Sequence, residues 1–267
     1  MLGLKAAALR WLVEGRQAVV VEVTSHSGSV PRERGTRMMV SADAVLGTIG
    51  GGHLELQAIQ QARAALLTQE IVERRIALGP TLGQCCGGAL TLRHTPLPQA
   101  DVAAWAEPAP RFELQLYGAG HVGRAIVRLL SGIACRVAWI DEREAEFPAA
   151  PSAPHIERVC VEPVEAEVAV APAGAFYLVL THQHDLDERI TEAILRRNDF
   201  GYLGLIGSAT KRARFMRRFE QRGIDAGALA RLTCPIGVPG IDGKEPEVIA
   251  VAVVAQLLQQ SNDPSRR

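Results

Sequence analysis

The chain has 267 residues, with 29 Lys and Arg against 29 Asp and Glu, so its formal net charge at pH 7 is zero. Apolar residues make up 48% of it, enough for the core of one large domain or two smaller ones without disulfides or structural metals. The balanced charge argues against nucleic acid or an anionic membrane as the main partner, because no long-range positive field would attract a polyanion.

Three features of the sequence bear on the compartment. The first 17 residues are charged and amphipathic rather than continuously apolar, so no signal peptide is expected. No run of about 18 uninterrupted apolar residues occurs, so no transmembrane helix is expected. The five cysteines are odd in number and two are adjacent, which is unlike a disulfide framework. We therefore expect a reducing, cytoplasmic setting.

The first part of the chain is predicted to mix helices and strands. Hydrophobic spacing and β-branched content predict a helix over 4–14, strands over 18–25 and 36–41, a helix over 53–67, and strands over 71–78 and 89–94. Four prolines between residues 93 and 111 disfavour a continuous helix or an inner strand there. We therefore predict a smaller mixed α/β domain over 1–95 and an interdomain linker over 96–110.

Beyond the linker, short apolar strands alternate with helices. Strands are predicted over 112–117, 136–141, 176–182 and 202–208, and helices over 121–132, 187–197, 209–223 and 245–260. Strands that are wholly apolar and alternate with helices are typical of a parallel sheet covered on both faces. The fold class is thus α/β, with a C-terminal Rossmann-like doubly wound parallel sheet over residues 111–267.

A glycine motif lies at the first strand-to-helix junction of this domain. Gly118, Gly120 and Gly123 form GxGxxG, in which the first glycine permits a tight turn, the second admits a phosphate, and the third lets helix and strand pack closely. The helix that follows would supply N–H donors and a positive dipole. Asp141 ends the next strand, near where a ribose-binding acid is expected. The same turn fits any phosphate ester, so a dinucleotide remains one alternative.

The segment GQCCGG places adjacent cysteines, Cys85 and Cys86, between glycines. Two neighbouring residues cannot easily share one tetrahedral zinc ion, and no CxxC partner exists, so structural zinc is not expected. Thiolates are soft ligands and sulfur nucleophiles, which suits a thiophilic metal or a sulfur acceptor. The alternative is a glycine-rich turn that carries two small apolar side chains.

Other polar loops are also candidates. GGGHLE at 50–55 could form an anion-binding nest, and arginines cluster in the loop over 26–37. His182 lies in THQHDLD after a strand, and Ser208 and Lys211 lie in GSATKR after the next one, where open α/β sheets bind ligands. The alternative for THQHDLD is that Asp185 or Asp187 caps a helix beginning at Glu188.

Several segments taken together resemble the XdhC/CoxI family, and they occur in order from about residue 18 to 258. The ending GKEP favours the xanthine dehydrogenase branch of that family over the CoxI-like branch. The segments are HSGSVPRERG, GTIGGGHLE, GQCCGG, LYGAGHVGRA, THQHDLD, LIGSATKRARF and CPIGVPGIDGKEPEVIA.

The resemblance implies a maturation factor, not an enzyme, that binds molybdenum cofactor (molybdopterin), supports its sulfuration and delivers it to the molybdenum subunit of xanthine dehydrogenase. A cysteine desulfurase or cofactor biosynthesis protein is a further expected partner, and a homodimer is the default assembly. We expect the molybdenum end to meet Cys85 or Cys86, and the phosphate to meet the glycine turn or Lys211. The full set of expected cofactor-binding residues is Cys85, Cys86, Gly118, Gly120, Gly123, Asp141, His182, Ser208 and Lys211.

Two other functions compete with this one. An NAD(P)-dependent oxidoreductase would use the glycine turn and Asp141, although no Tyr/Lys or His/Asp pair of characteristic spacing supports hydride transfer. A metal-dependent hydrolase would use His182, His184 and Asp185, but it leaves the paired cysteines unexplained.

Overall fold

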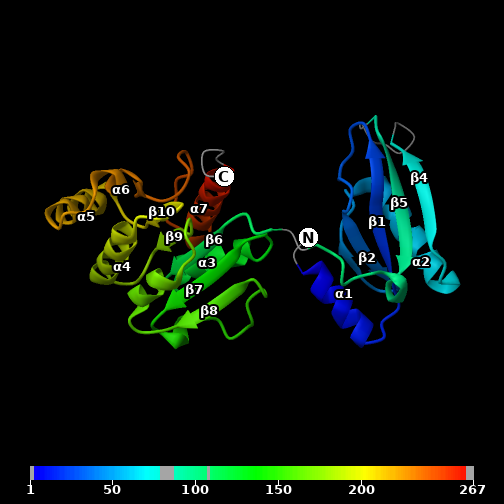
Figure 1. Ribbon diagram of the computed structural model, residues 1–267, viewed down its shortest axis with the longest axis horizontal. Helices are drawn as coiled ribbons and strands as arrows, with labels where there is room; N and C mark the ends of the chain where they lie inside the picture. The colour runs from blue at the N-terminus through cyan, green and yellow to red at the C-terminus, as the bar shows by residue number, and fades with distance from the viewer. Residues whose placement is uncertain (1–2, 79–86, 107–108, 263–267) are drawn as a thin grey trace. The chain divides into compact units, whose positions relative to one another are not determined.

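The computed structural model describes residues 3–78, 87–106 and 109–262. The chain divides into two compact units, Met1–Pro108 and Ala109–Arg267, which are described separately (Figure 1). No helix within the described residues is both long enough and apolar enough to cross a bilayer.

The first unit is an antiparallel sheet covered by helices. Its strands are β1 (Ala18–Ser27), β2 (Arg37–Ser41), β3 (Val45–Gly47), β4 (Val72–Ala77) and β5 (Ala89–Pro96), in the order β3-β2-β1-β5-β4. Helix α2 (Gly52–Thr68) packs on one face and α1 (Leu4–Val13) on the other. The valine run of β1 is explained by this arrangement, because alternate valines lie in the two separate cores.

Part of the segment predicted as a linker, 96–110, packs within the first unit. A short 3₁₀ turn, η2 (Leu97–Gln99), follows β5, and the side chains of Leu97, Val102 and Trp105 are buried against α1. Lys5 of α1 donates hydrogen bonds to the carbonyl oxygens of Ala103 (2.7 Å) and Trp105 (2.9 Å). The prolines disfavour a long helix or strand here, but the apolar residues between them still gain free energy by burial.

The second unit is a parallel, doubly wound sheet. Its strands are β6 (Glu113–Tyr117), β7 (Arg136–Asp141), β8 (Ile156–Cys160), β9 (Phe176–Val179), β10 (Tyr202–Leu205) and β11 (Leu232–Thr233), in the order β11-β10-β9-β6-β7-β8. Every strand pair is parallel. This confirms the predicted Rossmann-like fold class. The strand order reverses between β6 and β9, which is where such sheets bind ligands.

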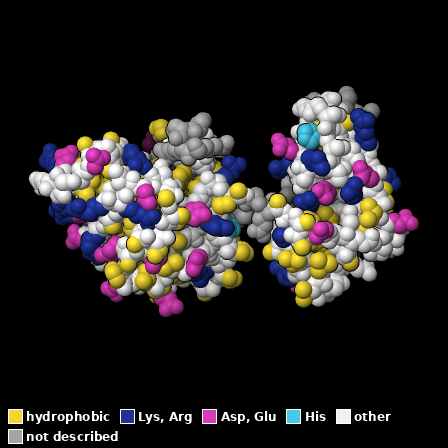
Figure 2. Space-filling view, in the orientation of Figure 1, with side chains coloured by type: hydrophobic (Ala, Val, Ile, Leu, Met, Phe, Trp, Pro, Cys, Tyr) yellow, Lys and Arg dark blue, Asp and Glu magenta, His cyan; other side chains and the backbone are white. Residues whose placement is uncertain are grey.

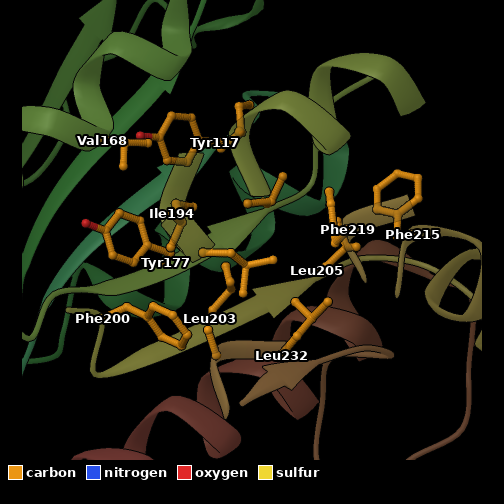
Figure 3. Packing of buried hydrophobic residues seen from close by; sticks show 14 of the residues in the cluster. Tyr117, Val168, Tyr177, Ile194, Phe200, Leu203, Leu205, Phe215, Phe219 and Leu232 are labelled. Carbon is orange, nitrogen blue, oxygen red and sulfur yellow. The ribbon is translucent and has the colours of Figure 1, made fainter. Parts of the chain in front are cut away.

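Helices cover both faces of this sheet. Residues of α3 (His121–Leu130) and α7 (Pro246–Ser261) form one core with the strands. On the other face lie α4 (His184–Arg197), α5 (Ala209–Gln221), α6 (Ala226–Ala230) and the 3₁₀ helix η4 (Val164–Val170); a further 3₁₀ turn, η3 (Glu144–Glu146), follows β7. Figure 3 shows the packing of this second core, including Tyr117, Val168, Tyr177, Ile194, Phe200, Leu203, Leu205, Phe215, Phe219 and Leu232.

Two helices of this unit begin at positions that matter for the site. α4 begins at His184, not at Glu188, so Asp185 and Asp187 lie inside its first turn. No side chain caps this helix, whereas the Ser208 hydroxyl caps α5 by accepting a hydrogen bond from the Lys211 backbone N–H. Lys211 is therefore the third residue of α5, within the helix predicted over 209–223.

Candidate functional site

The expected ligand-binding residues of the second unit gather at the carboxyl edge of its sheet. The glycine turn follows β6, Asp141 ends β7, His182 follows β9, and Ser208 follows β10. Because β6 and β9 flank the reversal in strand order, the turns after them line the crevice where doubly wound sheets hold ligands.

The three glycines of the turn are not equivalent. Gly118 has φ +122°, and a Cβ there would overlap the carbonyl oxygen of Leu180. A Cβ on Gly123 would overlap the carbonyl oxygen of Gly118, so this glycine allows α3 to approach β6. Around Gly120, by contrast, a Cβ would meet nothing within 4 Å. The open side of the turn thus lies at Gly120, at the start of α3, where a ligand phosphate could approach backbone N–H groups.

Asp141 is buried and already fully engaged. Its Oδ2 accepts a hydrogen bond from the Ala119 N–H (2.7 Å) in the glycine turn and one from Nη2 of Arg143 (2.9 Å). Its Oδ1 accepts from the backbone N–H and the Nε of Arg143, both at 2.9 Å. Burial alone would raise the pKa of Asp141, but these bonds hold it below the ordinary value. A ribose hydroxyl would have to displace Arg143 to reach this carboxylate.

His182 lies exposed at the end of β9, facing the neighbouring loop after β7. Its Nε2 is 3.8 Å from Oε1 of Glu142 and 2.8 Å from Nε2 of Gln183. His182, Gln183 and His184 line a pocket between the segments that follow β9 and β10. Within the described residues, no three His, Cys, Asp or Glu side chains are grouped closely enough to hold a metal ion.

A buried ion pair joins α4 to α5. Nζ of Lys211 is 2.5 Å from Oδ2 of Asp187, and the two side chains are 8% and 2% exposed. Lys211 also donates to the carbonyl oxygen of Ile206 (2.8 Å), and Oδ1 of Asp187 accepts from the backbone N–H and the hydroxyl of Thr181. The lysine thus fixes the two helix starts instead of offering a free charge to a ligand.

An open pocket lies between the first turns of α4 and α5, and both residues of this ion pair line it. It has a volume of about 410 Å³, within the range of roughly 300–1,000 Å³ usual for ligand sites. Its polar lining includes His182, Ser208, Thr210 and Arg214. A second hollow of about 380 Å³ continues past Arg214 along the two helices. Sequence reasoning missed Arg214, because one arginine in an arginine-rich helix carries no distinguishing pattern.

In the first unit, the glycine-rich loop before α2 is occupied by the chain itself. Oε2 of Glu55 accepts hydrogen bonds from the backbone N–H groups of Ile49 (2.9 Å) and Gly51 (3.0 Å) and from the Thr48 hydroxyl. Burial would raise the pKa of Glu55, but these bonds lower it overall. The expected anion nest therefore exists, and its anion is Glu55.

The paired cysteines Cys85 and Cys86 lie outside the described residues. The described chain resumes at Gly87, and the carbonyl oxygen of Gly88 accepts a hydrogen bond from the Leu78 N–H (2.8 Å). Gly88 packs against the backbone of Ser27 and Ser29, with no room for a Cβ. Gly88, two residues after Cys86, therefore lies beside the polar loop that follows β1.

Comparisons with known proteins agree with this architecture. The XdhC Rossmann domain family model matches residues 114–257, and the XdhC and CoxI family model matches residues 11–75. The Escherichia coli K12 protein YqeB, described as uncharacterized, is 31% identical over 257 residues, which cover 91% of this chain but only 43% of YqeB. The chain therefore spans less than half the length of that relative.

A crystal structure of a xanthine dehydrogenase from Bacillus halodurans shares the fold. It has a TM-score of 0.71 and 18% sequence identity, and the match covers 99% of this chain and 98% of that one. The first family model accounts for more than half of the chain. It covers the parallel sheet from residue 114 onward and the helices packed on it as far as residue 257 of α7. The chain is therefore a member of the XdhC and CoxI family.

Proposed function

We propose that this protein binds molybdenum cofactor as cargo, protects it, supports its conversion to the sulfurated form by a cysteine desulfurase, and delivers it to the molybdenum subunit of xanthine dehydrogenase. Family membership suggests the cargo. The observation that supports binding without catalysis is the state of the buried ionisable groups at the sheet edge: Asp141 and Asp187 are each paired with a cation of the chain itself.

This pairing limits what the site can do chemically. A general acid or base must be free to exchange a proton with a bound substrate. Asp141 is held by Arg143, and Asp187 and Lys211 hold each other. The groups left to face a ligand are imidazoles, hydroxyls, backbone N–H groups and the Arg214 guanidinium. All of these groups can bind a ligand by hydrogen bonds and charge, and the imidazoles of His182 and His184 are the ones that can also exchange a proton.

The cargo has two chemically different ends. Molybdenum is bound by dithiolene sulfur, and soft thiolates such as those of Cys85 or Cys86 are suitable further ligands for it. The other end carries a phosphate, for which the second unit offers the glycine turn. With 4% aromatic residues, the chain offers few rings for stacking, so we expect hydrogen bonds to recognise the pterin.

The test is cargo loading in a host that makes the cofactor. Wild-type protein, Cys85→Ala and Cys86→Ala are purified, and bound molybdenum and the fluorescent pterin oxidation product are measured per chain. Cys160→Ala is the matched control, because Cys160 is an exposed cysteine of the second unit. We expect the wild type and the control to carry both metal and pterin, and at least one cysteine variant to lose molybdenum. Undiminished loading in both cysteine variants refutes the cysteine assignment; no loading of the wild type refutes the function.

The competing oxidoreductase function makes a separate prediction. It requires NAD(P) at the glycine turn, with Asp141 turned toward the ribose. Because Arg143 occupies both oxygens of that carboxylate, we expect NADH fluorescence to change little on titration with the purified protein. Saturable binding of NADH at micromolar concentration would instead favour the oxidoreductase.

A further inference from the structure

Three of the four arginines of α5 differ from most other arginines in the second unit. Most are ion-paired with carboxylates, as Arg124, Arg143, Arg197 and Arg218 are. Arg212, Arg214 and Arg217 have no carboxylate partner anywhere in the described parts of the chain. Figure 2 shows Lys and Arg side chains gathered over this helix. In a protein of zero net charge, three uncompensated cations on one helix are a local excess.

One of the three faces a cavity. Arg214 lines both the 410 Å³ pocket and the adjoining 380 Å³ hollow, whereas Arg212 and Arg217 line neither. The single carboxylate of the larger pocket is Asp187, and its charge is balanced by Lys211 at 2.5 Å. The pocket therefore carries the net positive charge of Arg214.

Neutral donors converge on the same pocket. Ser208 and Thr210 line it, and the first turns of both α4 and α5 border it. The Ser208 oxygen accepts from the Lys211 N–H, so its own hydrogen stays available to a ligand. The buried ion pair between Asp187 and Lys211 holds these two helix starts together, which fixes the spacing of the donors before any ligand arrives.

We propose that the pocket between α4 and α5 is a binding site for a phosphate monoester, with the Arg214 guanidinium pairing with the phosphate oxygens. Arginine presents a planar fork of N–H donors that matches phosphate, and hydroxyls and helix N-termini complete the shell. The adjoining hollow, lined by Gln183, His184, Asp185, Arg214 and Arg218, leaves room for the esterified group. This site stands on the second unit alone and does not depend on the proposed cargo function.

Calorimetric titration of the full chain with inorganic phosphate tests the proposal. The variants are Arg214→Gln and, as a matched control, Arg217→Gln, which removes an equally exposed and unpaired arginine one turn further along α5. We expect saturable binding by the wild type and the control, and about a tenfold or larger loss of affinity in Arg214→Gln, the usual effect of losing a charge-assisted contact. Thermal unfolding without phosphate verifies that both variants fold.

Two results would overturn the proposal: no saturable phosphate binding by the wild type, or equal weakening in both variants, which is the signature of non-specific charge attraction. The outcome is separable from that of cargo loading. A protein that loads molybdenum but does not bind phosphate refutes this site and leaves the proposed function standing. A protein that binds phosphate through Arg214 but carries no molybdenum refutes the proposed function and leaves this site standing.

Discussion

The ion pair between Lys211 and Asp187 permits a quantitative test of how the site is held together. Replacement by Lys211→Met removes the cation but keeps most of the apolar stem, leaving a carboxylate that is 2% exposed with only the Thr181 hydrogen bonds. Breaking a buried pair in this way typically costs about 3–5 kcal/mol. Because Asp187 keeps those bonds, we expect a loss of about 3 kcal/mol in the free energy of unfolding of the second unit.

Trp139 provides a reporter specific to that unit. It is buried on β7, and its Nε1 donates to the carbonyl oxygen of Gly118 (3.0 Å). The other two tryptophans, Trp11 and Trp105, lie in the first unit and are replaced by Phe. In urea, with a slope of about 2 kcal/mol/M, the midpoint followed by Trp139 fluorescence should fall by about 1.5 M.

Two comparisons decide whether the loss comes from the ion pair. Lys244→Met removes an exposed lysine of the same unit and should change stability by less than about 0.5 kcal/mol. The double variant Asp187→Asn with Lys211→Met should be more stable than the sum of its single variants allows, by about 2 kcal/mol. The reasoning is refuted if Lys211→Met costs no more than Lys244→Met, or if the two single effects simply add.

Three other predictions concern the glycine turn and the first unit. Gly123→Ala should destabilise the second unit by about 1–3 kcal/mol in urea unfolding, because its Cβ would overlap the Gly118 carbonyl oxygen, whereas Gly120→Ala should be nearly neutral; equal effects would contradict the assigned geometry. Glu55→Gln should cost about 1–3 kcal/mol in the urea unfolding of the first unit by weakening three hydrogen bonds, and an unchanged midpoint would speak against the filled nest. Burial lowers the pKa of His94, and this effect is larger than the opposite effect of nearby backbone groups, which raise it. The unfolded state therefore takes up a proton at His94 more readily than the folded state does. The first unit should accordingly lose stability as the pH falls below about 6.5. Thermal unfolding at pH 7.5 and 5.5 tests this, since His94→Leu should flatten the pH dependence and a wild type equally stable at both values would refute it.

The second unit is predicted from the sequence better than the first, because several separate features of its sequence indicate the same structure. Apolar strands, helices and the glycine turn all indicate the same parallel sheet, and each is local in the chain. The strands that escaped prediction, β3, β8 and β11, are short and only partly buried, so neither periodicity nor apolar content marks them. Apolar residues of the predicted linker, such as Trp105, are buried in the core that α1 forms with β1 and β2, a packing that no local pattern reveals.

Sequence patterns placed candidate residues at the right sheet edge but did not assign their bonding partners. The strand pattern predicts the position of Lys211 after β10. Its pairing with Asp187, however, joins the helices that follow β9 and β10 and depends on side-chain geometry. The same holds for Asp141, whose partner Arg143 is only two residues away but could equally have pointed to solvent. The folding back of Glu55 was the more accessible inference, since an acidic residue in the first turn after a loop resembles a capping box.

The packing of α7 on α3 has a consequence for how the protein is made. Ala250, Val253 and Leu257 of the last helix share a core with Ile126 and Leu130 of the first helix of the same unit. During synthesis, that apolar face of the sheet stays uncovered until the ribosome has released α7, some 120 residues after α3 has emerged. We therefore expect nascent chains that stop before residue 246 to bind chaperones and to be cut readily by proteases, and resistance to appear abruptly once α7 is complete.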